Sequence, residues 1–190
     1  MNLTTKKMCF VALMTALTCV IAPFSVPIFL SPVPITFTNL VLYISIGILG
    51  YKLGTISYLL YLLLGLVGLP VFSSFGSGIG KLVGPTGGYL IGFIFLTFIG
   101  GLIMEKMEYK FFFILSGMIV GTIFVYLFGS LWLSYSSLWL SYSAHISFSK
   151  ALALGVLPYI LFDCIKIAVA SSLIVLIRRR LSFMIVNPQQ

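Results

Sequence analysis

The stretch "LPYILFDCIKIAVASSLIVLIRRR" (residues 157–180) decides the fold, because it is an apolar run that ends in three arginines. A helix that spans a bilayer needs about 20 apolar residues. Two charged residues, Asp163 and Lys166, interrupt this run, and each costs about 2.5–3.5 kcal/mol at the centre of a membrane. Three residues apart on a helix, they share one face and can pair. The run therefore predicts a last transmembrane helix that carries buried charge.

The rest of the chain is equally apolar. Of its 190 residues, 61% are hydrophobic and only 7% are charged, which excludes an ordinary soluble domain and fits a polytopic membrane protein. We predict an all-α fold, one membrane domain over residues 1–190, with six transmembrane helices. They are expected at about 8–29, 37–50, 54–69, 86–104, 111–133 and 151–177. Pro23 and Pro27 should kink the first helix.

The positive charges predict the orientation of these helices. With an even number of spans, both termini lie on one side, and the positive-inside rule places them in the cytoplasm. Eight cations then lie inside and two outside. The inner ones are Lys6, Lys7, Lys52, Lys106, Lys110, Arg178, Arg179 and Arg180, and the outer ones are Lys81 and Lys150. The net charge of +8 thus reflects membrane topology, and we expect no nucleic-acid partner.

The outer connections are longer than the short, charged inner turns, which indicates a binding site that faces outward. They cover residues 30–36, 70–85 and 134–150. The third contains a tandem heptad, "LWLSYSS" followed by "LWLSYSA" (131–144). Its aromatic and serine content suits a membrane interface, and a local duplication without function is an equal alternative.

Signals for enzymes and metals are weak. "GSGIGK" (76–81) lacks the first glycine and the final Ser or Thr of a phosphate-binding loop, because Phe75 and Leu82 occupy those positions. His145 is the single histidine, and the three cysteines lack a metal-binding spacing. No catalytic triad or carboxylate pair is present. We therefore expect neither an enzyme nor a metal site nor a bound cofactor.

The charged pair in the last helix is the strongest candidate site. Ionisable residues inside a membrane usually mark the path or binding site of a solute. A carboxylate that accepts and an ammonium that donates suit a ligand with N–H donors and a carbonyl, such as a urea group. The alternative is an ion pair that only fixes helix packing.

Three segments resemble one family. They are "SPVPITFTNL" (31–40), "YLLLGLVGLPVFSSFGSGIGKLVGPTGGYLIGF" (61–93) and "LPYILFDCIK" (157–166). Together they resemble BioY, the biotin-binding S component of energy-coupling factor (ECF) transporters. Thr38 departs from the family pattern PVPxTxQ, which has glutamine at that position.

The resemblance implies a six-helix, S-component-like bundle that occludes biotin near its outer face. It also implies a bacterial cell membrane and three partners, namely a transmembrane coupling protein and two cytoplasmic ATPases. The chain has no nucleotide site of its own, so uphill transport would need that outside energy. Alternatives are an S component for another vitamin, and a membrane assembly protein without a small ligand.

Biotin is a urea fused to a thioether ring with a valerate tail, which suggests roles for the candidate residues. Asp163 could accept from a ureido N–H, and Lys166 could donate either to the ureido oxygen or to the valerate carboxylate. The other substrate-binding candidates are Thr38, Phe72, Phe75, Lys81, Tyr89 and Phe162, of which the aromatic ones would wall the rings. Gly87 and Gly88 should let their helix approach its neighbours closely. Ala12 and Ala16 form a small-xxx-small face, and the resemblance implies that this face docks on the coupling protein.

Overall fold

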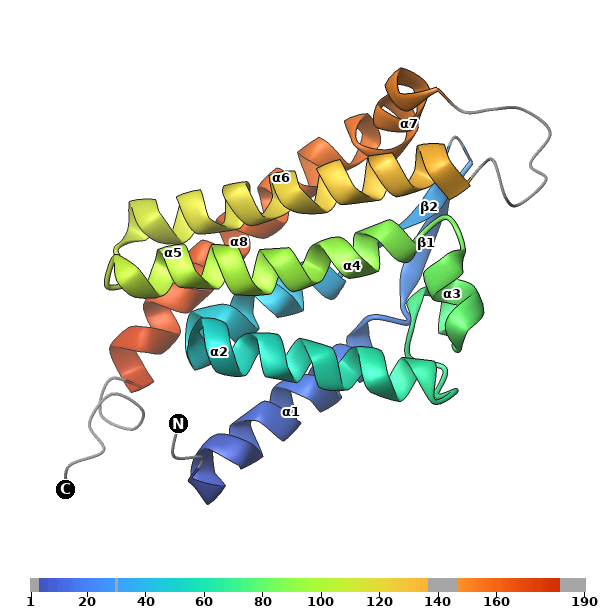
Figure 1. Ribbon diagram of the computed structural model, residues 1–190. Coiled ribbons are helices and arrows are strands. Elements are labelled where there is room, and N and C mark those ends of the chain that lie inside the picture. The colour runs from blue at the N-terminus through green and yellow to red at the C-terminus, as the bar shows by residue number, and fades with distance from the viewer. Residues whose placement is uncertain (1–3, 30, 137–146, 182–190) are drawn as a thin grey trace.

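The computed structural model describes residues 4–29, 31–136 and 147–181, and helices dominate it (Figure 1). The helical elements are α1 (Thr5–Ile21), α2 (Thr38–Leu66), η1 (Ser73–Phe75), α3 (Ile79–Val83), α4 (Gly87–Phe95), η2 (Leu96–Gly100), α5 (Gly101–Lys106), α6 (Phe111–Ser136), α7 (Phe148–Gly155) and α8 (Leu157–Leu181). Four helical stretches in the described ranges are long and apolar enough to cross a membrane: 38–66, 87–106, 111–135 and 157–179. The predicted all-α membrane fold is confirmed, with one small hairpin added.

Element α2 is two helices joined by a sharp reversal at Gly50, whose φ is +80°. A Cβ atom on Gly54 would lie 2.8 Å from the side chain of Ile46, although eight residues of straight helix span about 12 Å. The two halves therefore run antiparallel, which matches the separate predicted runs 37–50 and 54–69. Only glycine adopts this backbone conformation without strain.

The first predicted run, 8–29, is helical only as far as Ile21. Beyond Pro23 the chain forms a two-stranded antiparallel hairpin, β1 (Ser25–Ile28) and β2 (Ser31–Thr36), with Val26 opposite Ile35. The expected kink is thus a helix end, because proline removes a backbone donor and clashes with the preceding turn. Prolines are tolerated in this hairpin since both of its strands are edges.

The last predicted run, 151–177, is also divided. The short α7 ends at Gly155, Val156 leaves helical geometry, and α8 begins at Leu157. Pro158 fits in the first turn of α8, where a missing N–H costs nothing. This break turns α7 away from α8 and leaves α8 with Asp163 and Lys166 on one face.

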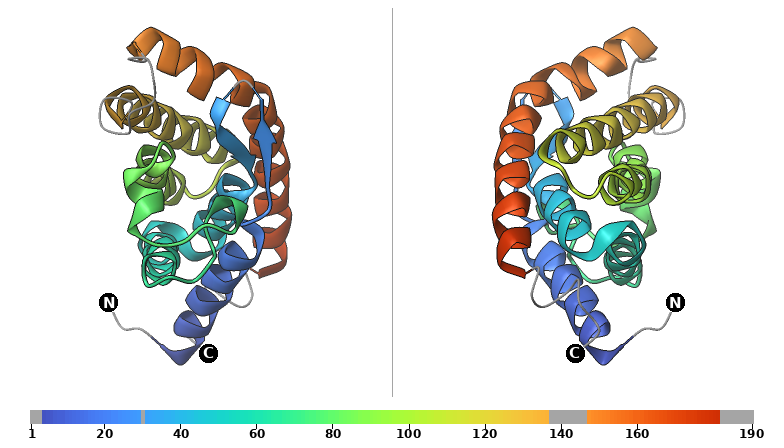
Figure 2. Two further views of the ribbon diagram at one scale, coloured as in Figure 1. Left: turned by 90° about the vertical axis from the view of Figure 1, so that its right-hand side faces the viewer. Right: turned by 90° about the vertical axis from the view of Figure 1, so that its left-hand side faces the viewer.

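The bundle has two distinct ends (Figures 1 and 2). The starts of α1 and α6, the reversal in α2 and the end of α8 gather at one end, whereas the hairpin, α3 and α7 lie at the other. At the first end, the Arg178 guanidinium lies 3.0 Å from the centre of the Tyr109 ring and donates to Gly47 O at 2.6 Å. Burial raises the pKa of Tyr109 to about 12, so the ring faces that cation as a neutral phenol.

Glycines allow α4 and α6 to pack closely. A Cβ atom on Gly88 would lie 2.1 Å from Cβ of Trp132 and 2.6 Å from the main-chain oxygen of Phe128. Gly87 is also confined, since its Cβ would meet the carbonyl of Leu82 in α3 at 1.6 Å and would lie 3.1 Å from Nε1 of Trp132 in α6. The expectation that these two glycines permit close helix approach is confirmed.

Replacing Gly88 by alanine should therefore destabilise the fold. Overpacking of a well-filled contact typically costs about 1–3 kcal/mol, and we expect the melting temperature in detergent to fall by about 3–10 °C. Gly80→Ala is the matched control, because a Cβ there meets no atom within 4 Å. Equal melting temperatures for the two variants would contradict the packing argument.

Candidate solute-binding site

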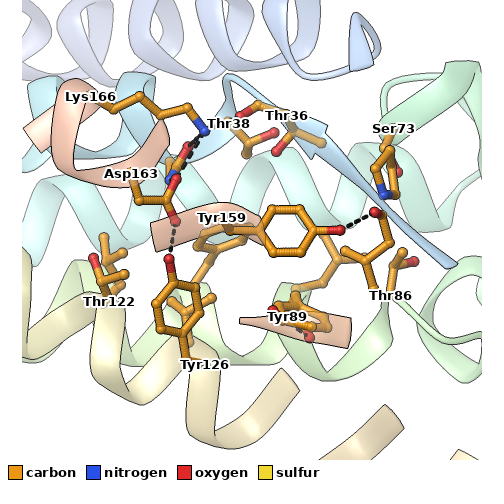
Figure 3. A pocket seen from close by; sticks show the side chains of 18 of the residues that line it. Thr36, Thr38, Ser73, Thr86, Tyr89, Thr122, Tyr126, Tyr159, Asp163 and Lys166 are labelled. Atoms are coloured by element: carbon orange, nitrogen blue, oxygen red, sulfur yellow. Dashed lines mark hydrogen bonds and ion pairs between the residues drawn. The ribbon is translucent and has the colours of Figure 1, made fainter. Parts of the chain in front are cut away.

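A pocket of about 690 Å³, its mouth included, lies among the hairpin, α2, α4, α6 and α8. Ligand pockets usually combine apolar walls with a few placed polar groups. Hydrophobic and aromatic side chains form most of this wall, and polar groups cluster at the α8 side. The labelled side chains in Figure 3 converge on the pocket from all of these elements.

Asp163 is the centre of the polar cluster and is 7% exposed. Its Oδ1 accepts from Asn39 Nδ2 at 2.8 Å and from Lys166 Nζ at 3.0 Å, and its Oδ2 accepts from the Tyr126 hydroxyl at 2.6 Å. A buried charge is tolerated only when it is paired and hydrogen-bonded. We call Asn39, Tyr126, Asp163 and Lys166 the charged centre.

Lys166 is equally buried and uses all three of its N–H groups. Besides Asp163, its Nζ donates to Asn39 Oδ1 at 3.1 Å and to the main-chain oxygen of Thr36 at 2.7 Å. An ammonium has three donors and no acceptor. The ammonium is therefore satisfied inside the protein and ties the end of β2 to α8.

A second tie joins β2 to the same face of α8. The Tyr159 hydroxyl lies 2.9 Å from Ser31 Oγ and also reaches the main-chain oxygen of Val33. Tyr159, Asp163 and Lys166 follow the i, i+4, i+7 spacing of one helix face. The contacts of Tyr159 and Lys166 with the strand form what we call the β2–α8 seam.

The structure brings four of the predicted substrate-binding residues to the pocket and separates four from it. Thr38, Tyr89, Asp163 and Lys166 line it. Thr38 is 3% exposed and lies beside the charged centre, and the Tyr89 hydroxyl donates to Gly155 O at 3.1 Å. The residues that the structure separates from the pocket are Phe72, Phe75, Lys81 and Phe162.

The three phenylalanines have other surroundings, and none of them lines the pocket. Phe72 is fully buried behind the pocket, with its ring against Tyr61. Phe75 is 60% exposed and contacts Phe24, and Phe162 is 45% exposed. Phe162 directly precedes Asp163, so the 100° rotation per residue of a helix turns it away from the pocket. Lys81 lines a second hollow that adjoins the pocket.

Other aromatic and hydroxyl side chains take the places expected for those phenylalanines. They are Tyr43, Tyr61, Phe93, Thr122, Tyr126 and Tyr159. Tyr43 and Thr122 hydrogen-bond to each other at 2.5 Å. The spacing of Tyr159 four residues before Asp163 is a signal that sequence reasoning missed. Asn39 and Tyr126 have no such signal, because they meet Asp163 only through tertiary packing.

The remaining predictions fall elsewhere. Ala12 and Ala16 lie on the exposed side of α1, opposite the face that packs on α2 through Val11, Met14 and Thr15. The repeat at 131–144 lies partly outside the described residues, and His145 lies wholly outside them. Within the described ranges, no three His, Cys, Asp or Glu side chains gather as a metal site.

The fold and the pocket define an integral membrane protein that can hold a small solute with both apolar and hydrogen-bonding parts. A sequence profile described as the BioY family matches residues 1–183. This chain belongs to the BioY family.

Named relatives agree with this assignment. The chain is 41% identical to "Probable biotin transporter BioY" of Pyrococcus horikoshii, over 87% of this chain and 91% of the relative. It is 40% identical to "Biotin transporter BioY" of Thermotoga maritima, over 83% and 86% of the two chains. These relatives are named as transporters, not as enzymes.

A solved structure has the same fold. It is a crystal structure of "the S-component for biotin from an ECF-type ABC transporter", 31% identical in sequence with a TM-score of 0.84. The similarity covers 94% of this chain and 95% of the other. The predicted S-component-like bundle is confirmed.

Proposed function

We propose that this protein is the biotin-capturing S component of an ECF-type vitamin transporter. The observation that carries the proposal is the charged centre, buried in the wall of a pocket of a BioY family member. A urea group needs acceptors for its N–H groups and a donor for its oxygen, and the centre contains both kinds of group. The aromatic wall supplies apolar surface for the thioether ring.

Asp163 is proposed to accept a ureido N–H. An ionised carboxylate has about four acceptor sites, and the described contacts occupy three of them. Lys166 differs, because its three donors are already used. A contact between Lys166 and the ureido oxygen therefore requires biotin to replace one of these internal bonds. Thr38 and Tyr89, which also line the pocket, would contact the bound biotin directly.

The protein is proposed to lie in a cell membrane with both termini in the cytoplasm. The described inner cations lie at the end where α1 starts and α8 ends, and the hairpin, α3 and α7 lie at the opposite end. The pocket would then face outward, which suits uptake. The exposed side of α1 at Ala12 and Ala16 is proposed to dock on a transmembrane coupling protein, which two cytoplasmic ATPases would drive.

The direct test is to purify the protein from cells grown with biotin and to identify any retained small molecule by mass spectrometry. We expect biotin. Added biotin should also raise the melting temperature of the emptied protein, because a ligand that binds only the folded state stabilises it. Thiamin and riboflavin are the matched controls and should have no effect. Retention of another vitamin would change the assigned substrate. If neither biotin, thiamin nor riboflavin stabilised the protein, the alternative of a membrane assembly protein without a small ligand would be favoured.

A further inference from the structure

A second hollow adjoins the pocket at the end of the bundle that carries the hairpin and α3. It measures about 610 Å³, its open mouth included, and Ser31, Ser74, Lys81 and Thr86 give it a polar lining among several prolines. We call it the outer hollow. Pro34 and Thr86 line both the outer hollow and the pocket, so the two cavities adjoin at these residues.

Lys81 is the cation of the outer hollow, and no ion pair among the described residues neutralises its charge. The side chain is half-buried, and its stem lies over Gly76, where an added Cβ would be 2.0 Å from Cε of Lys81. Among the hydrogen bonds and ion pairs of the described residues, none involves the ammonium of Lys81. The other residues in the hollow offer hydroxyl groups and no carboxylate.

No acid of this chain is placed to pair with Lys81. The chain has three acidic residues. Glu105 lies in α5 and Glu108 in the connection from α5 to α6, both at the opposite end of the bundle. Asp163 already has Lys166 as its partner. A half-buried ammonium without a counter-charge favours an anion from outside.

The two lysines near the ligand path therefore differ in what they can bind. The ammonium of Lys166 uses its three N–H groups in internal hydrogen bonds, whereas no hydrogen bond among the described residues uses the ammonium of Lys81. Figure 3 shows Asp163 and Lys166 at one end of the pocket and Ser73 and Thr86 at the other. Thr86 also lines the outer hollow. A ligand with its polar head at Asp163 would extend its tail past Thr86 toward Lys81.

We infer that the outer hollow is the subsite for the ligand's carboxylate, which the ammonium of Lys81 binds. This inference rests on the proposed function and deepens it, because it requires a ligand with a free acid at the end of its tail. It assigns the valerate carboxylate to Lys81 and leaves Lys166 to the ureido head. The protein should then discriminate against analogues whose carboxylate is blocked.

The test compares biotin with biotinamide, which has the same rings and tail but a neutral carboxamide. Calorimetry on the full-length protein in detergent gives both affinities. The wild type should bind biotin about 5- to 30-fold more tightly than biotinamide, as expected for a charge-assisted hydrogen bond that is partly open to water. Lys81→Gln should lose most of this preference through weaker biotin binding, with biotinamide affinity unchanged.

Two variants serve as controls. Lys81→Arg keeps the charge and should keep the preference, and Lys150→Gln removes the exposed cation of α7 and should change neither affinity. A Lys81→Gln protein that retains the wild-type preference would overturn the inference, as would a wild type that binds both compounds equally. A wild type that binds neither compound would refute the proposed function and this inference with it.

Discussion

Replacing Asp163 by asparagine is expected to weaken biotin binding by about 10- to 100-fold, and Lys166→Ala should have a similar effect. Each change removes one member of a charged centre in which both residues are only 7% exposed. The remaining charge then lacks its partner in a site that water hardly reaches. Isothermal titration of the purified variants measures the loss. Glu108→Gln and Lys52→Ala, at the opposite end of the bundle, are the matched controls.

Thermal stability separates ligand binding from helix packing. Removing one partner of a buried ion pair costs about 3–5 kcal/mol, whereas replacing both by uncharged groups is often neutral. The double variant Asp163→Asn with Lys166→Met should therefore regain most of the melting temperature that each single variant loses. Its biotin affinity should stay low. If biotin affinity recovered together with stability, the pair would only pack α8 against the hairpin.

The second large effect is expected on the exposed side of α1. Ala12→Trp and Ala16→Trp should abolish biotin uptake in cells that supply the coupling module, while biotin binding by the isolated protein stays nearly unchanged. Small side chains let helices approach closely in a membrane, and an indole ring would hold the partner helix away. The pocket lining includes no residue of α1, so binding should survive.

Two further tryptophan variants make this test specific. Leu161→Trp adds the same ring to an exposed position of α8 and should leave uptake intact. Thr15→Trp replaces a buried residue of α1 whose hydroxyl lies 3.1 Å from Ser57 Oγ, and should damage the fold itself. Uptake at the wild-type rate in the Ala12 and Ala16 variants would refute the docking face. If these variants lost biotin binding as severely as uptake, the exposed side of α1 would be needed for folding and not for docking.

Some features of the fold and the site could be predicted from the sequence because they violate a strong physical rule. Asp163 and Lys166 are charges within an apolar run, so their position in a buried site follows from the cost of charge in a membrane. The separate helices on either side of Gly50 could be predicted because Lys52 and two glycines, Gly50 and Gly54, interrupt the apolar sequence there. The hairpin could not be read in this way, because its alternating prolines and apolar residues resemble a broken helix.

The partners of Asp163 were beyond sequence reasoning for a different reason. Asn39 lies 124 residues away and Tyr126 lies 37 residues away, so only the packing of three helices brings them together. Helical phase explains why Phe162 does not line the pocket. Phe162 is adjacent to Asp163 in sequence yet faces away, whereas Tyr159, four residues earlier, shares its face. Applying the helical period to residues 157–166 would have favoured Tyr159.

The β2–α8 seam has a consequence for how fast a bound solute can leave. Tyr159 and Lys166 hold the strand near its two ends, at Ser31 and Thr36, and both belong to one rigid helix. Strand β2 therefore cannot separate from α8 at one of its ends alone, because the other end is bound to the same helix. Opening the pocket on this side thus becomes a single cooperative event that breaks several hydrogen bonds at once. Such a barrier slows dissociation and favours a long residence time, the kinetic property that a scavenger of a scarce nutrient needs.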